Sequence, residues 1–338
     1  MKKFVCIILV LAFAVPLVFA GGTGQSKNNI VIYTSMYEDA IEAVKKDLSR
    51  HFPRYHIEFV YGGTGTLQAR IAGEQAAGRL GCDIILVAEP AYSLELKEKG
   101  MLHSYQSVQA SSLAFDFDPD GFWYPVRVSN MVLAYNPERN ARNTVPDSFR
   151  DFANDTRVRG AVSMSNPLVS GTAMATIAAL GAQYGEEYFE ALGRQRVMID
   201  SGSVALEKLE KGECRVAMIL EELVLKKRQE ENSRLEVIYP ADGTVVIPST
   251  IMIVNSRWSA NRNTSAAEAI TDWFLSEEGQ NAIVASWMHS VRTDFPKLPH
   301  GAAPTSEILA NSMPVHWENY GQWEKILNSF EEAVTHRR

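Results

Sequence analysis

Four short apolar runs in this chain each end in hydroxyl or glycine residues and then give way to a helical pattern. Each combination of a strand, a tight loop and a helix start predicts one unit of a parallel sheet covered by helices. The four segments, each written with the loop that follows it, are residues 30–33 with Thr34-Ser35, residues 57–61 with Gly62 to Thr66, residues 161–164 with Ser165 to Thr172, and residues 196–199 with Asp200 to Ser203.

These loops have the chemistry of an anion site. The start of a helix leaves backbone N–H groups unpaired and carries partial positive charge, and small hydroxyl or glycine residues let an anion reach those groups. In open α/β sheets the same junctions lie at the carboxyl ends of the strands, where ligands bind. Ordinary helix caps and turns use the same residue types. Four such loops in one chain nevertheless favour a ligand-binding cleft over simple capping. The candidate ligand residues from the loops are Thr34, Ser35, Gly63, Thr64, Ser170, Gly171, Thr172, Asp200 and Ser201.

The amino terminus has the pattern of a secretory signal. Met1-Lys2-Lys3 is basic, residues 4–19 are apolar, and Ala20-Gly21 offers a small-residue cleavage site. A membrane-spanning helix is the alternative, but the run is shorter than the roughly 20 residues that a span needs. The pattern predicts a signal peptide over residues 1–20 and a secreted protein.

Composition narrows the possible functions. The net charge is −7 and no basic stripe appears, so nucleic acid is not an expected partner. We find no Gly-x-Ser-x-Gly elbow, no Walker A loop, no paired metal-binding histidines and no Cys/His arrangement. The sequence therefore favours a binding protein over an enzyme and calls for no cofactor. Cys82 and Cys214 each precede an apolar strand in different predicted lobes, and we expect both thiols to be free.

The order of the predicted elements indicates an α/β fold with two lobes. Strands and helices alternate over residues 29–102 and again over 149–239, while two long extended segments, 122–137 and 244–255, bracket the second unit. We interpret the extended segments as two crossover strands that join two doubly wound sheets. The predicted lobes are residues 29–125 plus 250–300 and residues 126–249 plus 301–338.

Several motifs carry a resemblance to a known family: Ile32-Tyr33-Thr34-Ser35, Gly81-Cys82-Asp83-Ile84, residues 132–137, Ser170-Gly171-Thr172, Lys211-Gly212-Glu213 and residues 274–280. With them the mature chain resembles extracytoplasmic solute-binding proteins of ABC importers, in the group that includes the periplasmic ferric-ion-binding proteins. The resemblance implies a type II, Venus-flytrap fold, a periplasmic location, and docking on the permease and ATPase subunits of an importer. It also implies a monomer that closes on a small anionic ligand.

The chain departs from the ferric-binding members at the metal ligands. Those members carry two adjacent tyrosines where this chain has Glu221-Glu222, and a histidine at a position that matches Tyr37. Glu89 lies where they place an acidic ligand. Members with such departures include binding proteins for phosphorylated small organics, such as hexose phosphates, phosphoglycerate and aminoethylphosphonate. The resemblance therefore implies an organophosphate ligand, with ferric ion as the alternative.

Three charged positions complete the candidate site. Arg127, on the first crossover strand, offers a charge-assisted contact to a phosphate, or else forms a salt bridge at the hinge. Asp200 and Glu222 accept hydrogen bonds and suit the paired hydroxyls of a sugar. The alternative is that these acids lie at helix N-termini only because the partial positive charge there stabilises a carboxylate. The order of the two acids leaves open whether Glu221 or Glu222 faces the cleft.

Overall fold

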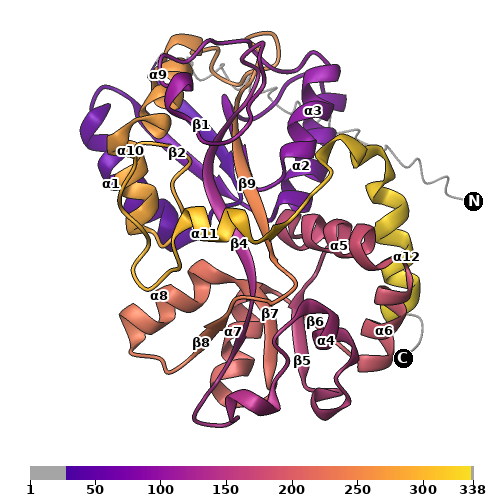
Figure 1. The fold of residues 1–338 in the computed structure, drawn as a ribbon. Helices are drawn as coiled ribbons and strands as arrows, with labels where there is room; N and C mark the ends of the chain where they lie inside the picture. Colours follow the sequence, from indigo (N-terminus) through magenta and orange to yellow (C-terminus); the bar gives the residue numbers. More distant parts are fainter. Residues whose placement is uncertain (1–27, 336–338) are drawn as a thin grey trace, which may run out of the picture.

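A computed structural model describes residues 28–335 of the chain. Within those residues no helix has the length and apolar character needed to cross a membrane. The predicted signal peptide lies outside the described residues. Figure 1 shows two α/β halves, one above the other, with two long strands running between them.

A single curled sheet links the two halves. Its strands follow the order β2-β1-β3-β9-β4-β7-β5-β6, while β8 pairs with β4 and β10 pairs with β9. The bounds of the strands are β1 Asn29–Thr34, β2 His56–Tyr61, β3 Ile84–Val87, β4 Tyr124–Tyr135, β5 Val162–Ser165, β6 Met198–Asp200, β7 Val216–Leu220, β8 Glu236–Ile238, β9 Thr244–Ile253 and β10 Ser312–Met313.

The strand directions bring two sets of strand ends together. Strands β1, β2 and β3 are parallel to one another, and so are β5, β6 and β7. Strand β9 is antiparallel to β3 and β4, and β4 is antiparallel to β7. The two parallel sets therefore run in opposite directions, and their carboxyl ends face each other. This is the edge where α/β sheets bind ligands.

Helices cover the sheet in two groups, which define the halves used below. The β1–β3 half carries α1 Glu38–His51, α2 Thr64–Ala76, α3 Pro90–Glu98, α9 Thr264–Leu275 and α10 Glu277–Ala285. The β5–β7 half carries α4 Phe149–Asn154, α5 Gly171–Tyr184, α6 Glu187–Gln195, α7 Gly202–Lys211, α8 Glu221–Glu231 and α12 Trp323–Thr335, which packs on α5 and α6. Helix α11, Thr305–Ala310, and four short 3-10 turns complete the described chain.

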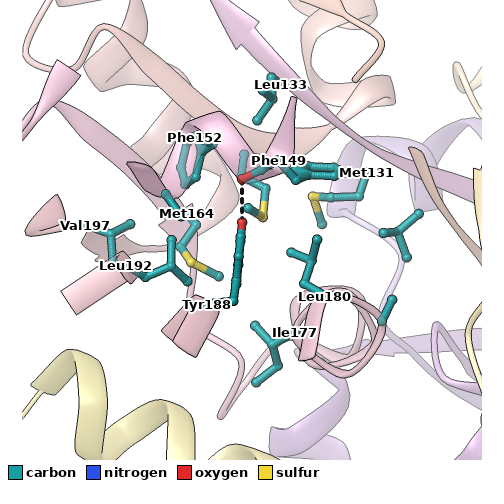
Figure 2. Close-up of a cluster of buried hydrophobic side chains, with 14 of the residues drawn as sticks. Met131, Leu133, Phe149, Phe152, Met164, Ile177, Leu180, Tyr188, Leu192 and Val197 are labelled. Atoms are coloured by element: carbon teal, nitrogen blue, oxygen red, sulfur yellow. Dashed lines mark hydrogen bonds between the residues drawn. The ribbon is translucent and has the colours of Figure 1, made fainter. Parts of the chain in front are cut away.

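Each half has its own hydrophobic core. In the β5–β7 half, Phe149, Phe152 and Leu192 are buried with residues of β4 and α5 (Figure 2). The Tyr188 hydroxyl donates to the Phe149 carbonyl oxygen at 2.9 Å inside this core. A buried polar group that keeps its hydrogen bond costs little free energy, so the tyrosine fits among apolar side chains.

The predicted fold is confirmed, with local corrections. The four strand–loop–helix junctions are present, and the extended segments form β4 and β9. Arg196 does not begin β6, because it takes a left-handed conformation (φ 59°) that ends α6. Near the carboxyl end, Trp317–Gln322 form a 3-10 turn that leads into α12 at Trp323. The lobe boundaries stay a prediction.

The two cysteines of the described chain are free and buried. Cys82 lies before β3 and Cys214 lies before β7, so the two thiols belong to different halves. Burial raises the pKa of both thiols above the ordinary value. They are therefore poor nucleophiles and pack as small apolar side chains.

Candidate ligand-binding cleft

A cavity of about 310 Å³ lies where the carboxyl ends of the two strand sets meet. Both halves contribute to it, chiefly through the four predicted junctions. Its lining residues are Ser35, Tyr37, Tyr61, Gly63, Thr64, Thr66, Ala88, Arg127, Ser165, Asn166, Val169, Ser170, Gly171, Thr172, Asp200, Ser201, Gly202, Ser203, Leu220 and Glu222. Eleven of the thirteen predicted site residues are in this lining.

Helix starts converge on the cleft from both halves. Helix α2 begins beside it with Gly63 as N-cap, and α5 and α7 begin with the N-caps Ser170 and Ser201. The hydroxyl oxygens of the two serines accept from the backbone N–H groups three residues further on. The serines therefore act as helix caps, which was the alternative to a ligand-binding role. They also lie on the cleft wall.

The two halves touch directly beside the cleft. The Gly65 N–H donates to the Val169 carbonyl oxygen at 3.3 Å. A Cβ atom at Gly65 would overlap the Leu168 carbonyl oxygen, and one at Gly63 would overlap that of Val169. Only glycine lets α2 approach the 166–170 loop this closely. The structure is thus a closed arrangement of the halves.

A buried pair of opposite charges forms one wall of the cleft. The Glu222 carboxylate accepts from the Ser129 hydroxyl at 2.9 Å and lies 3.9 Å from an Arg127 nitrogen. Burial raises the pKa of Glu222, while the Arg127 charge opposes that shift. Burial also lowers the pKa of Arg127. The Arg127 Nη1 donates to the Met288 sulfur at 2.6 Å, and its Nε has no partner among the described residues.

Asp200 lines the cleft from the β5–β7 half, and its charge is already paired. Lys208 Nζ lies 2.7 and 2.8 Å from the two carboxylate oxygens. The Ser163 hydroxyl donates to Oδ2 at 2.7 Å. The side chain of Asp200 keeps 11% of its surface exposed. Asp200 therefore holds β5, β6 and α7 together as well as facing the cleft.

Two phenols line the cleft, and sequence reasoning found only one of them. The rings of Tyr37 and Tyr61 are 6.5 Å apart. Burial and the Glu222 charge raise the pKa of Tyr37 well above its ordinary value. The pKa of Tyr61 is raised too, chiefly by burial. At neutral pH both phenols are protonated and can donate hydrogen bonds.

Thr34 and Glu89, both predicted at the site, do not line the cleft. Thr34 is fully buried, and its hydroxyl accepts from the Met36 N–H at 3.1 Å. Glu89 faces a neighbouring cavity beside α12 and accepts from the Gln68 amide at 3.0 Å. Burial raises the pKa of Glu89 to about 8, so this acid is mostly uncharged at neutral pH. A strand-end position alone did not determine which way these side chains point.

The two adjacent acids at the start of α8 face different surroundings. Glu222 lines the cleft, whereas Glu221 points into a buried network at the crossover strands. There it accepts from His289 Nε2 at 2.9 Å, from the Asn130 amide at 3.2 Å and from the Tyr239 hydroxyl. Glu222 is therefore the acid available to a ligand, and Glu221 is structural.

We expect Glu221→Ala to lower the free energy of unfolding by about 3 kcal/mol, because it leaves the buried donors of His289 and Asn130 unpaired at about 1–3 kcal/mol each. Urea denaturation followed by circular dichroism measures this loss. The matched control is Glu231→Ala on the exposed end of the same helix, which should change stability by about 0.5 kcal/mol or less. A loss for Glu221→Ala no larger than that of the control would contradict the structural role.

The sequence prediction missed several lining residues. Thr66, Ser165, Asn166, Gly202 and Ser203 belong to the same junctions that were recognised as loops, so the signal for them was present. The lining also contains apolar residues that no hydroxyl or glycine pattern marks, because their side chains carry no polar group: Val169, Ala88 and Leu220. Their position depends on how the halves pack.

The described residues contain no group of three or more histidine, cysteine or acidic side chains placed to hold a metal ion. The charged side chains on the cleft lining are Arg127, Asp200 and Glu222. Since Arg127 lies beside Glu222 and Lys208 beside Asp200, the formal charges cancel. What remains facing the cavity is a set of hydroxyl groups and helix starts.

Residues 82–321 match the sequence profile of bacterial extracellular solute-binding proteins. The chain belongs to this family. This solute-binding protein is 22% identical, over 279 residues, to the "Probable ABC transporter periplasmic-binding protein y4fP" of Sinorhizobium fredii, covering 78% of this chain and 75% of that protein. The family resemblance inferred from the motifs is thereby confirmed.

Two solved structures show the same fold. The periplasmic binding protein AfuA of Actinobacillus pleuropneumoniae, with fructose 6-phosphate bound, superposes with a TM-score of 0.78 at 21% identity, covering 91% of this chain and 99% of that one. Iron-bound HitA of Pseudomonas aeruginosa superposes with a TM-score of 0.77 at 20% identity, covering 90% and 99%. The solute-binding protein therefore has the type II periplasmic-binding-protein fold, and proteins of this fold take chemically different ligands.

Proposed function

We propose that this solute-binding protein captures a small organic phosphate, such as a sugar phosphate, and delivers it to an ABC importer. The observation that carries the proposal is the composition of the cleft. Hydroxyl groups and helix starts from both halves face a cavity whose formal charges cancel. Such neutral donors are well suited to a phosphate oxygen.

The phosphate would contact the starts of α2, α5 and α7. Thr64 and Thr172 offer hydroxyl groups there, beside backbone N–H groups that have no acceptor within their own helices. A bond from such a donor to a charged group is worth about 1.5–3 kcal/mol. Several of them together support tight binding without a paired cation.

The remainder of the ligand would face Glu222 and the phenols. Glu222 is an acceptor, and Tyr37 and Tyr61 add ring surface and hydroxyl donors. These groups match the hydroxyls of a sugar. The cavity volume is at the lower end of the range of about 300–1,000 Å³ for small-molecule sites, which suits one compact metabolite.

Ferric ion is the second candidate, favoured by the two phenols and Glu222 on the lining. Phenolate and carboxylate oxygens are hard ligands for such a cation. Arg127, however, lies 3.9 Å from Glu222 and already pairs with that carboxylate. Its positive charge opposes a metal cation there and supports the organic phosphate over iron.

The other parts of the proposal follow from the family. We propose a periplasmic location after cleavage of residues 1–20, a monomeric state, no catalytic activity and no cofactor. The partners would be the permease and ATPase subunits of one importer. AfuA, with its bound sugar phosphate, supports the ligand class by similarity of fold.

A thermal-shift panel tests the ligand class. A true ligand present at 100 times its dissociation constant should stabilise the protein by about 2.7 kcal/mol. The panel contains hexose phosphates, phosphoglycerates, aminoethylphosphonate, thiamine and ferric citrate, and native mass spectrometry identifies any molecule that is purified with the protein. We expect a shift with at least one organic phosphate. A shift with ferric citrate alone would contradict the proposal.

A further inference from the structure

Lys208 lies outside the cleft lining but pairs with an acid that belongs to it. It lies on α7 and reaches back to the end of β6, where its Nζ meets both oxygens of Asp200 at 2.7 and 2.8 Å. The side chain of Lys208 is 23% exposed and that of Asp200 is 11% exposed. Partial burial of this kind limits screening of the pair by solvent and salt.

Without Lys208, the cleft would carry an excess negative charge. Glu222 has Arg127 beside it at 3.9 Å, so that pair is balanced. Asp200 is the remaining charged group on the lining, and its cation is Lys208. An unpaired carboxylate on the wall would repel an anionic ligand, since like charges a few ångströms apart interact strongly at low dielectric.

We propose that Lys208 is a specificity-determining residue, which sets the sign of ligand charge that the cleft accepts by cancelling the charge of Asp200. This inference rests on the proposed function, because it takes the ligand to be an anion. Lys208 acts through Asp200 and is a positioning residue, not a ligand contact. Its loss would turn an anion site into one that favours neutral or cationic molecules.

A purely structural role for the ion pair makes a different prediction. Removing either partner breaks the same contact, so Lys208→Met and Asp200→Asn would then weaken binding alike. A charge-setting role predicts opposite directions, because one variant leaves the cleft more negative and the other leaves it more positive. The double variant restores the neutral cleft.

Calorimetric titration with fructose 6-phosphate separates these roles. We expect Lys208→Met to bind at least tenfold more weakly than the wild type. Asp200→Asn alters a residue of the cleft lining, so its affinity is compared with that of Lys208→Met and should be higher. The double variant should likewise bind more tightly than Lys208→Met. Lys208→Gln gives the same order if Lys208→Met does not fold. The matched control is Lys211→Met, on the same helix and paired with Glu207 at the surface, which should bind as the wild type does.

Equal losses for Lys208→Met and Asp200→Asn, or no loss for Lys208→Met, would overturn the inference and leave the proposed function standing. A wild-type protein that binds no anion, as judged by the thermal-shift panel, would overturn the proposed function, and this inference with it. The two failures are therefore distinguishable.

Discussion

Gly65→Ala should weaken ligand binding by more than tenfold while leaving the unliganded protein at least as stable as before. A Cβ atom at this position overlaps the Leu168 carbonyl oxygen of the opposite half, so the halves cannot close fully. Separation of the halves would remove that overlap, and alanine favours a helix over glycine by about 0.5–1 kcal/mol. The variant therefore tests closure of the two halves without lowering the stability of the unliganded protein.

Small-angle scattering with and without fructose 6-phosphate measures the closure. The wild type should become more compact when ligand is added, because a ligand that contacts both halves favours their closed arrangement. Gly65→Ala should stay expanded. The matched control is Gly73→Ala, later in α2, where an added Cβ meets nothing within 4 Å. Normal affinity and full compaction in Gly65→Ala would show that the contact with Leu168 is not needed for binding.

The second large effect concerns the hydroxyl groups at the anion site. Thr64→Val combined with Thr172→Val removes two donors with little change in shape. Each bond to a charged group is worth about 1.5–3 kcal/mol, so the combined loss should exceed a hundredfold in affinity. Ser170 is a less clean target, because its hydroxyl also caps α5 and its loss would cost stability.

Calorimetry with fructose 6-phosphate tests this pair of substitutions. Thr176→Val is the matched control, since its buried hydroxyl donates to the Thr172 carbonyl within α5 and does not line the cleft. It should leave affinity unchanged. If the double variant binds as the wild type does, the threonines only shape the helix starts, and the phosphate is held elsewhere.

The sequence predicted the fold and most of the cleft because the relevant signals are local. An apolar run, a serine or glycine loop and a helical repeat lie next to one another in the chain, and the capping serines Ser170 and Ser201 act within three residues. The opposite directions of the two strand sets then bring these local units together. No long-range information was needed to place them at the strand ends.

The remaining features depend on contacts between distant segments. Glu221 and Glu222 have the same local signal, and only His289 and Ser129, far away in the chain, decide which acid faces the cleft. The approach of Gly65 to Leu168 likewise joins the two halves. Such contacts have no periodicity or spacing by which a single sequence can reveal them.

The most direct test of the account is a calorimetric titration of the wild-type protein with fructose 6-phosphate and, in parallel, with fructose. If neutral donors at the helix starts hold a phosphate, the phosphorylated sugar should bind with one site per chain, and the neutral sugar should bind far more weakly. Equal binding of both sugars, or binding of ferric ion with no response to any organic phosphate, would contradict the account.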